Sequence, residues 1–457
     1  MKSTVMKHCF ALLIIALLNV AASCSSSNRI NTSTEPCLEQ VTLISRHSVR
    51  APLLKYMTSL DSLIGPQNKW PEWSVEGGHL SLRGAMLEYL SGEYFRNYLS
   101  DKGFTTSPEQ SYWGASPKQR TVETARAFAC GFFHGNRVPI EYKGERDFDP
   151  KYLDSQYLPL INTWSCDGGE VFDFEAFRIE AKKEMEEVAS AQTYLDANLT
   201  ILEDRLDLAH SKFAKKRNTI HFKRDFVESI RIEQFTTKNE LAEPEFADDS
   251  HFREANRASD ALILQYYEQD HSTLNKSNAF LGLTEHDIER LASIKDAYGE
   301  ILFTAPIIAV NVSHDMLASV KANMEIPGRK LTFLCTHDST IAALLAALRA
   351  ETGELDKAIE KHTPIGVKII IEKWRVGEEY YATANLVYQS VVQLRAASPA
   401  DVQDAPVFKK ISFKGLTRSA NGMYRYDDLM SHIDRTLALY HRTARGENPF
   451  SPAQSCP

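Results

Sequence analysis

The segment that most constrains this chain covers residues 41–52, with the sequence Val-Thr-Leu-Ile-Ser-Arg-His-Ser-Val-Arg-Ala-Pro. It begins with β-branched and apolar residues, which predict a buried strand, and Pro52 ends any strand that reaches it. Arg46, His47 and Arg50 therefore stand near the carboxyl end of a strand, where open α/β sheets bind ligands. Two guanidinium groups around one imidazole favour a tetrahedral oxyanion beside a nitrogen nucleophile. A solvated basic rim is the alternative that this segment alone leaves open.

A second segment, residues 330–340, repeats this pattern about 290 residues later. An apolar run ends in His337 and is followed by Asp338 and by the helix-forming run 341–348. Residues 338–340 are Asp, Ser and Thr, which favour the start of a helix. The free N–H groups of that helix would then point at the same anion.

A third segment, residues 116–121, reads Ser-Pro-Lys-Gln-Arg-Thr. Ser116 as N-cap, Pro117 as the first helical residue and Gln119 as capping-box partner predict the start of a helix. Arg120 would lie in its first turn, where a cation opposes the helix dipole. That position is unfavourable unless an anion binds there, so Arg120 is a candidate anion ligand.

Together these three segments resemble the signature motifs of the histidine acid phosphatase family. The matching residues are R-H-x-x-R-x-P at 46–52, R-T at 120–121 and H-D at 337–338. Longer strings, such as N-K-W-P-E-W at 68–73 and T-P-I-G-x-K at 363–368, are similar to the bacterial periplasmic glucose-1-phosphatases, which are related to the phytases. The likeness runs from about residue 39 to about residue 435 and is thin across about 170–255.

The resemblance implies hydrolysis of a phosphomonoester through a phosphohistidine. His47 would be the nucleophile and Asp338 the acid that protonates the leaving oxygen. The bound phosphate is expected to raise the pKa of Asp338, so that activity would be highest at acidic pH. The phosphate ligands would be Arg46, Arg50, Arg120 and His337. Three guanidinium groups can supply the charge stabilisation, so neither a cofactor nor a metal is expected.

An acid glucose-1-phosphatase is the function that the resemblance favours. Ser48 stands where the family usually has Gly, and glucose-1-phosphatases also lack that Gly, which weighs against general phytase activity. A broad acid phosphatase or phytase is the alternative. A more remote one is a lipoprotein that binds sugar phosphate without catalysis, but an acidic group beside a bound dianion would not help such a protein.

The predicted fold is α/β, with a mixed, mostly parallel sheet flanked by helices and a smaller, mostly helical cap domain. The expected α/β domain comprises residues 39–150 and 299–457, with the cap domain at 151–298 between them. Glu and Lys are dense in the cap, which mostly indicates a solvated helical insertion. Caps over a phosphate site select substrates, and Glu240 or Glu243 could hydrogen-bond sugar hydroxyls while repelling highly phosphorylated esters.

The first 23 residues have the pattern of a signal peptide. Lys2 and Lys7 precede an apolar stretch of 14 residues, 9–22, and small residues follow. Cleavage before Cys24 would suit a plain exported protein or a bacterial lipoprotein acylated at Cys24, and residues 24–38 have the composition of a tether. We expect a bacterial periplasmic or membrane-anchored protein that acts on a small phosphate ester. A net charge of −8 without a long basic run argues against nucleic acid as a partner.

Seven cysteines occur in the chain, two of them in the signal region. The other five lack the pairing of a zinc site. The resemblance implies a disulfide between Cys166 and Cys456, which export would permit. Cys335, inside the predicted strand before His337, is expected to be a buried free thiol, and the pairing of Cys37 and Cys130 stays open.

Overall fold

The computed structural model describes residues 35–53, 60–144, 154–163, 171–224, 228, 230–234, 241–246, 250–396, 399 and 404–451. For residues 230–234 and 241–243 it describes the backbone alone. The predicted signal peptide, Cys24, Glu240 and the predicted Cys166 and Cys456 pair lie outside the described residues.

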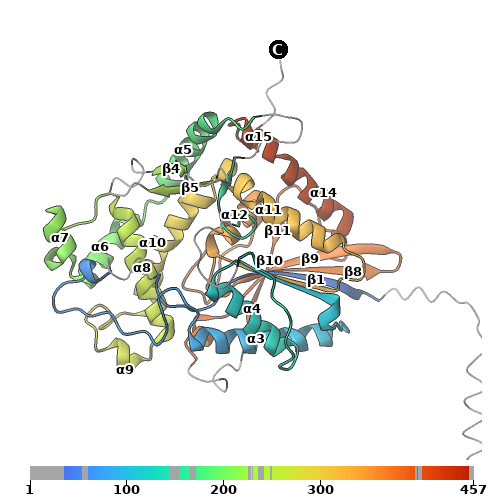
Figure 1. The fold of residues 1–457 in the computed structure, drawn as a ribbon, viewed down its shortest axis with the longest axis horizontal. Coiled ribbons are helices and arrows are strands. Elements are labelled where there is room, and N and C mark those ends of the chain that lie inside the picture. The colour runs from blue at the N-terminus through green and yellow to red at the C-terminus, as the bar shows by residue number, and fades with distance from the viewer. Residues whose placement is uncertain are drawn as a thin grey trace, which may run out of the picture.

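A seven-stranded mixed sheet forms the centre of one half of the molecule (Figure 1), with the order β10-β9-β8-β1-β6-β2 and β12 paired with β9. Its strands are β1 (Cys37–Arg46), β2 (Ser111–Ala115), β6 (Leu331–Thr336), β8 (Lys368–Val376), β9 (Glu379–Tyr388), β10 (Val407–Lys410) and β12 (Tyr424–Arg425). β1 and β2 run parallel to β6, whereas every other pairing is antiparallel. The α/β prediction is confirmed, but "mostly parallel" is wrong, because the C-terminal strands follow one another in a meander that needs no crossover helix.

Helices cover both faces of this sheet. α3 (Leu82–Asp101) and α4 (Gln119–Phe132) pack on one face, and α11 (Pro306–Glu325), α12 (Asp338–Ala347) and α14 (Tyr426–Ala438) pack on the other. Alternate residues of each buried strand supply the two cores, as the pleat requires. In β6, for example, Phe333 lies in the core under α3 and α4, and Leu334 lies in the core under α11.

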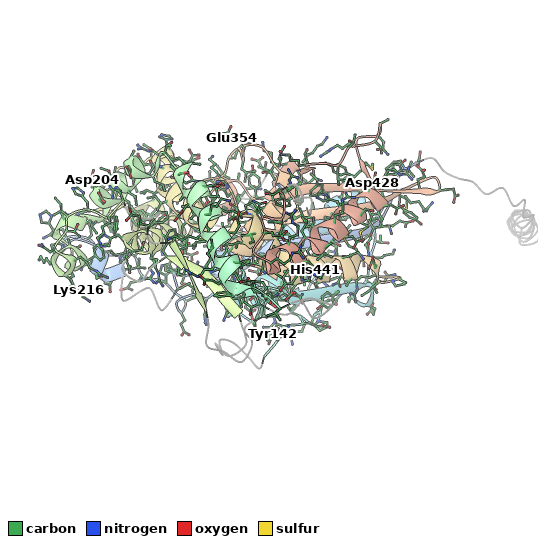
Figure 2. All side chains as sticks on the ribbon, turned by 90° about the horizontal axis from the view of Figure 1, so that it is seen from above. Tyr142, Asp204, Lys216, Glu354, Asp428 and His441 are labelled. Atoms are coloured by element: carbon green, nitrogen blue, oxygen red, sulfur yellow. The ribbon has the colours of Figure 1, made fainter. Side chains whose placement is uncertain are left out.

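The other half is mostly helical and has its own core around α10 (Glu285–Phe303). Its other elements are α5 (Phe174–Ser190), α6 (Leu195–Leu206), η2 (Leu208–His210), α7 (Lys212–Arg217), α8 (His251–Glu268), α9 (His271–Leu274) and the three-stranded sheet of β3 (Ile161–Asn162), β5 (Leu241–Phe246) and β4 (Ile230–Gln234). The sequence did not predict this small sheet, because strands of two to six residues leave little periodicity. Figure 2 shows the molecule elongated from Asp204 and Lys216 in this half to Asp428 in α14.

Short elements complete the described chain: η1 (Pro108–Gln110), β7 (Ala350–Glu351), α13 (Val391–Leu394), β11 (Ser412–Phe413) and α15 (Tyr440–Ala444). No single helix among the described residues is long and apolar enough to cross a membrane. α10 and α11 together have the length and the composition, but the pair is bent by 84°.

Ser81 caps α3 by accepting a hydrogen bond from the Gly84 N–H, and Gly103, with φ of 74°, follows its last turn. One local prediction of the sequence is confirmed. Cys335 is a buried free thiol, while Cys37 and Cys130 are free as well.

Candidate active site

Three parallel strands end side by side at one edge of the central sheet. Arg46 of β1 is in register with Thr336 of β6, so His47 and His337 are the next residues on neighbouring strands. Their ring centroids lie 5.6 Å apart. On the other side of β6, the Ser116 N–H donates to the Cys335 carbonyl. The strand pairing therefore brings together the three segments that were predicted to meet.

His47 is held as a neutral imidazole with one unprotonated nitrogen. It is 2% exposed, and its Nδ1 lies 2.9 Å from the Ser48 carbonyl, which can only accept a hydrogen bond. Nδ1 therefore carries the proton, and Nε2 keeps its lone pair. Burial, together with repulsion from Arg120, Arg50 and Arg46, holds the pKa of His47 well below its usual value.

His337 connects the start of α4 to the start of α12. Its Nδ1 accepts from Arg120 Nη2 at 3.3 Å, which leaves Nε2 to donate to Ser116 Oγ at 2.9 Å. The predicted capping box of α4 is wrong: the helix starts at Gln119 after Lys118, and Ser116 binds His337 instead of capping. Arg120 nevertheless lies in the first turn, as predicted. Burial first and Arg120 second lower the pKa of His337 well below its usual value, so this ring is neutral too.

Arg50 is placed by contacts on both sides. Its backbone bridges to Leu80, whose N–H donates to the Gln119 side chain at the start of α4. Its Nη2 lies 3.1 Å from Asp260 Oδ2 of α8. Arg50 is thereby tied to the helix that carries Arg120 and to the helical half of the molecule.

We call Arg46, Arg50 and Arg120 the arginine cluster. Each of these side chains has an N–H donor, the buried Nε, that lacks an acceptor among the described residues. Burial, followed by repulsion from Arg50, lowers the pKa of Arg120. Buried donors without acceptors are costly, and an anion bound among these side chains would satisfy them and offset their mutual repulsion.

Asp338 belongs to a closed ring of four alternating charges, the charge ring. Asp338 Oδ2 lies 2.9 Å from Lys295 Nζ and 3.2 Å from Arg46 Nη2. Glu360 Oε1 closes the ring at 3.1 Å from Lys295 and 2.7 Å from Arg46. Although burial alone would raise the pKa of Asp338, Lys295 and Arg46 outweigh it and hold that pKa well below its usual value. The carboxyl group expected to donate a proton is thus an ion-paired carboxylate here.

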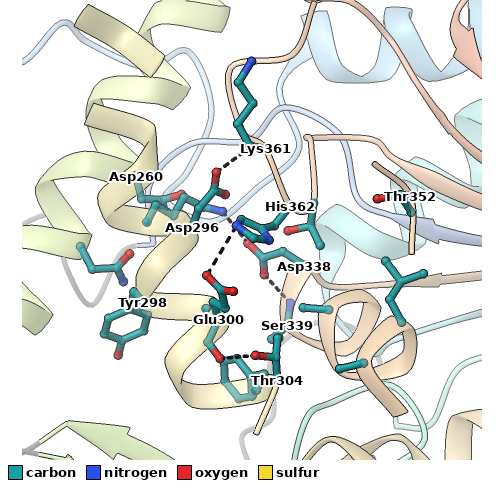
Figure 3. Close-up of a pocket in the computed structure, with 18 of the residues that line it drawn as sticks. Asp260, Asp296, Tyr298, Glu300, Thr304, Asp338, Ser339, Thr352, Lys361 and His362 are labelled. Atoms are coloured by element: carbon teal, nitrogen blue, oxygen red, sulfur yellow. Dashed lines mark hydrogen bonds and ion pairs between the residues drawn. The ribbon is translucent and has the colours of Figure 1, made fainter. Parts of the chain in front are cut away.

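A pocket of about 450 Å³ opens beside Asp338 and Arg50 (Figure 3), within the size range of small-molecule sites. Asp260 of α8 lines it together with Asp296 and Glu300 of α10, Ser339 of α12 and His362, whose Nε2 lies 3.5 Å from Glu300 Oε2. We call it the side pocket. Its polar lining combines four carboxylates with hydroxyl groups and with the cations Arg50, Lys295 and Lys361.

The predicted phosphate ligands and the two predicted catalytic residues lie together at this edge, whereas the specificity residues are not placed there. Glu240 lies outside the described residues, and Glu243 is described only as backbone in β5.

Sequence reasoning missed Lys295, Glu360 and Asp260. Lys295 stands among the apolar residues Ile294 and Ala297, and a lysine in such a stretch was the available signal of a buried charge; the structure shows both neighbours fully buried. Glu360 and Asp260 carried no such signal. Among the described residues, no group of three or more His, Cys, Asp and Glu side chains could hold a metal ion.

A family model and several known enzymes match most of this chain. A family model described as histidine phosphatase superfamily (branch 2) matches residues 37–388. A glucose-1-phosphatase from Salmonella typhimurium is 29% identical over 90% of this chain and 97% of its own, and one from Providencia rettgeri is 28% identical over 88% and 92%. Phytase AppA of Escherichia coli is 24% identical over 84% of this chain and 89% of its own.

Solved structures show the same fold. Hafnia alvei phytase in complex with myo-inositol hexakis sulphate has a TM-score of 0.71 at 20% identity, covering 88% of this chain and 97% of that one. Citrobacter braakii phytase has a TM-score of 0.69 at 20% identity, covering 88% and 98%.

Proposed function

The chain belongs to branch 2 of the histidine phosphatase superfamily and is a phosphoric monoester hydrolase, and on that premise we propose that it hydrolyses glucose 1-phosphate through a phosphohistidine on His47. The observation that supports this most is the neutral tautomer of His47, with Nε2 free beside the arginine cluster. A nucleophile needs that lone pair, and the phosphoryl group needs fixed positive charge around its oxygens. Two curated glucose-1-phosphatases that match nearly the whole chain support the choice of ester.

In the proposed first step, Nε2 of His47 attacks phosphorus in line with the leaving oxygen. The P–O ester bond breaks as the N–P bond forms, and Arg46, Arg50, Arg120 and His337 bind the non-bridging oxygens. Asp338 gives its proton to the departing sugar oxygen. A water then attacks the phosphohistidine and gives a proton to Asp338. The N–P bond breaks, which releases phosphate and restores His47 and the protonated Asp338. Positioning and charge stabilisation are the main requirements of phosphoryl transfer.

We further propose that the side pocket receives the leaving group, because Asp338 and Arg50 line it. Sugar hydroxyls can donate hydrogen bonds to the carboxylates of Asp260, Asp296 and Glu300. The same carboxylates would repel further phosphate groups on a polyphosphorylated ester. A neutral sugar therefore suits the pocket better than inositol hexakisphosphate.

Release of inorganic phosphate from glucose 1-phosphate, inositol hexakisphosphate and an aryl phosphate at acidic pH tests the proposal. We expect turnover of glucose 1-phosphate and the aryl phosphate to exceed that of inositol hexakisphosphate. Rapid acid quenching should trap an acid-labile phosphate on the wild-type protein. His47→Ala should fold and lose nearly all turnover. Preferred turnover of inositol hexakisphosphate would identify a phytase, and binding of sugar phosphate without phosphate release would contradict catalysis.

The proposal extends to export, to a lipid anchor and a disulfide at cysteines outside the described residues, and to the domain organisation. Residues 1–23 would direct export in a bacterium, Cys24 would carry a lipid, and Cys166 would pair with Cys456. Residues 151–298 would form the cap domain. Replacement of Cys24 by Ser should move the protein from the membrane fraction to the soluble periplasmic fraction, and mass spectrometry of the unreduced protein should find the Cys166 and Cys456 peptides joined. An unchanged fractionation would contradict the anchor.

A further inference from the structure

The charge ring poses a problem for the proposed acid. A carboxyl group that gives a proton to the leaving oxygen must first hold one, yet two cations lie within 3.2 Å of Asp338 Oδ2. Arg46 is already required for the phosphate, whose oxygens would compete with Asp338 for its Nη2. Lys295 has no such second task among the contacts of the described residues: its ammonium group contacts Asp338 and Glu360.

We propose that Lys295 is a positioning residue that sets the pH below which Asp338 can donate its proton, with Glu360 as the opposing charge that limits its effect. This inference depends on the proposed function, in which Asp338 is the proton donor. Lys295 also lines the side pocket, but in this inference it acts on the reaction through Asp338 and does not bind the phosphoryl group.

The charges that face Asp338 come from several elements. Arg46 and His47 lie at the end of β1, Lys295 lies on α10, and Glu360 lies in the loop before β8. His337 precedes Asp338 directly and is neutral, as described above. Across the side pocket, Arg50 is paired with Asp260 at 3.1 Å. Of these groups, Lys295 is the cation that stays close to Asp338 without being drawn to the phosphate.

Stability is a weak explanation for such a ring. Glu360 is 1% exposed and Lys295 is 10% exposed, and taking these charges out of water costs free energy that their attraction barely returns. Apolar residues of similar volume often stabilise a core as well or better. A control of protonation, by contrast, needs both signs of charge near the carboxyl group.

The direction of each effect follows from the sign of the charge. A cation near Asp338 favours the carboxylate, so Lys295 lowers the pH at which Asp338 takes up its proton. Glu360 is an anion that pairs with Lys295 and so partly offsets the effect of Lys295 on Asp338, which raises that pH. Loss of Lys295 and loss of the Glu360 charge should therefore act in opposite directions, which a purely structural role would not produce.

The measurement is the ratio of kcat/KM for glucose 1-phosphate to kcat/KM for an aryl phosphate, followed across pH. An aryl leaving group departs without a proton, so the ratio removes effects on His47 and on phosphate binding. In the wild type, the ratio should fall as pH rises and Asp338 loses its proton. Lys295→Met should move the midpoint of this fall upward by about one to three pH units, the usual effect of a close charge.

Three further variants make the test specific. Glu360→Gln keeps the side-chain shape and should move the midpoint downward, and Lys295→Arg keeps the charge and should leave it near that of the wild type. Lys102→Met is the matched control, since Lys102 is an ion-paired lysine bound to Glu372, which pairs with Val41 in the middle of β1. It should not move the midpoint.

An unchanged or lowered midpoint in Lys295→Met would overturn the inference. If Lys295→Met does not fold, Glu360→Gln is the deciding variant. A midpoint that moves upward or stays unchanged in Glu360→Gln overturns the inference. The proposed function fails separately, if the wild type releases no phosphate from glucose 1-phosphate or if His47→Ala retains turnover. If hydrolysis proceeds through His47 but the midpoint does not change in the Lys295 and Glu360 variants, only the role of Lys295 is refuted.

Discussion

A single proton on His47 decides which of its ring nitrogens can react. The Ser48 carbonyl holds that proton on Nδ1, and the arginine cluster opposes a second one. Because the pKa of His47 is lowered, the neutral form persists below pH values at which an ordinary histidine is protonated. The arrangement thus keeps a nucleophile available under the acidic conditions that protonation of Asp338 requires.

The acid limb of kcat/KM for an aryl phosphate should therefore lie well below pH 6.5, the ordinary pKa of histidine. The pH profile with an aryl phosphate measures this, since proton donation by Asp338 matters little there. Corrected for the ionisation of the substrate, an acid limb near the ordinary histidine value would contradict the depressed pKa of His47.

Replacement of Asp338 by Ala should slow hydrolysis of glucose 1-phosphate by about 10²–10⁴-fold, the contribution of a general acid. The aryl phosphate should lose much less, because its leaving group needs no proton. Steady-state kinetics with both esters measures the difference. If both rates fell equally, Asp338 would not be the proton donor.

At the level of elements, the position of Arg120 depends on how closely α4 packs against α3. A Cβ atom on Gly92 of α3 would lie 2.1 Å from the Phe128 carbonyl oxygen, and one on Gly131 of α4 would lie 2.0 Å from the Tyr89 carbonyl oxygen. Backbone touches backbone at both glycines. Any side chain there must push α4, and with it Arg120, away from its place.

Gly92→Ala should destabilise the fold by about 1–3 kcal/mol, the usual cost of overpacking, and should raise KM for phosphate esters by moving Arg120. Gly299→Ala is the matched control for stability, since a Cβ there meets nothing within 4 Å and Gly299 lies inside α10. That change should stabilise by up to about 1 kcal/mol through helix propensity. Thermal unfolding and kinetics check both; an equally stable Gly92→Ala protein would contradict the tight packing.

The sequence predicted the strands that form continuous apolar runs. β1 and β6 were identified this way, and the motifs that follow them, with the start of α4, predicted that His47, Arg120 and His337 meet. The charge ring was not predicted, because Lys295 and Glu360 come from a helix and a loop that only the packed structure brings beside Arg46. Nor were the side-pocket carboxylates Asp296 and Glu300, since a helix rich in acidic residues more often faces solvent.

The whole molecule buries several charges and uncharged histidines to form its site. His47 and His337 stay neutral in the folded protein, while the unfolded chain takes up protons near pH 6.5. Stability is therefore lost as pH falls below about 6.5. Glu360 and Asp338 have lowered pKa values, so their contribution is present above their ordinary pKa values and is lost as pH falls through the lowered ones. Both effects destabilise the protein in acid.

Inorganic phosphate should offset this loss, because it binds the folded arginine cluster and not the unfolded chain. At a concentration of 100 times Kd, the stabilisation should reach about 2.7 kcal/mol. Arg120→Met should reduce the effect, whereas Arg126→Met, on the same helix but about half exposed and paired with Glu123, should preserve it. Thermal unfolding with and without phosphate is the measurement, and equal stabilisation of both variants would contradict the role of Arg120.

One helix, α10, presents Lys295 to the proposed proton donor and the adjacent Asp296, with Glu300, to the compartment for the alcohol portion of the ester. The pH dependence of activity and the choice of substrate are therefore coupled in this protein. A variant in which α10 is remodelled or shifted to accept a bulkier alcohol should also show a changed pH optimum, so engineering of either property requires measurement of both.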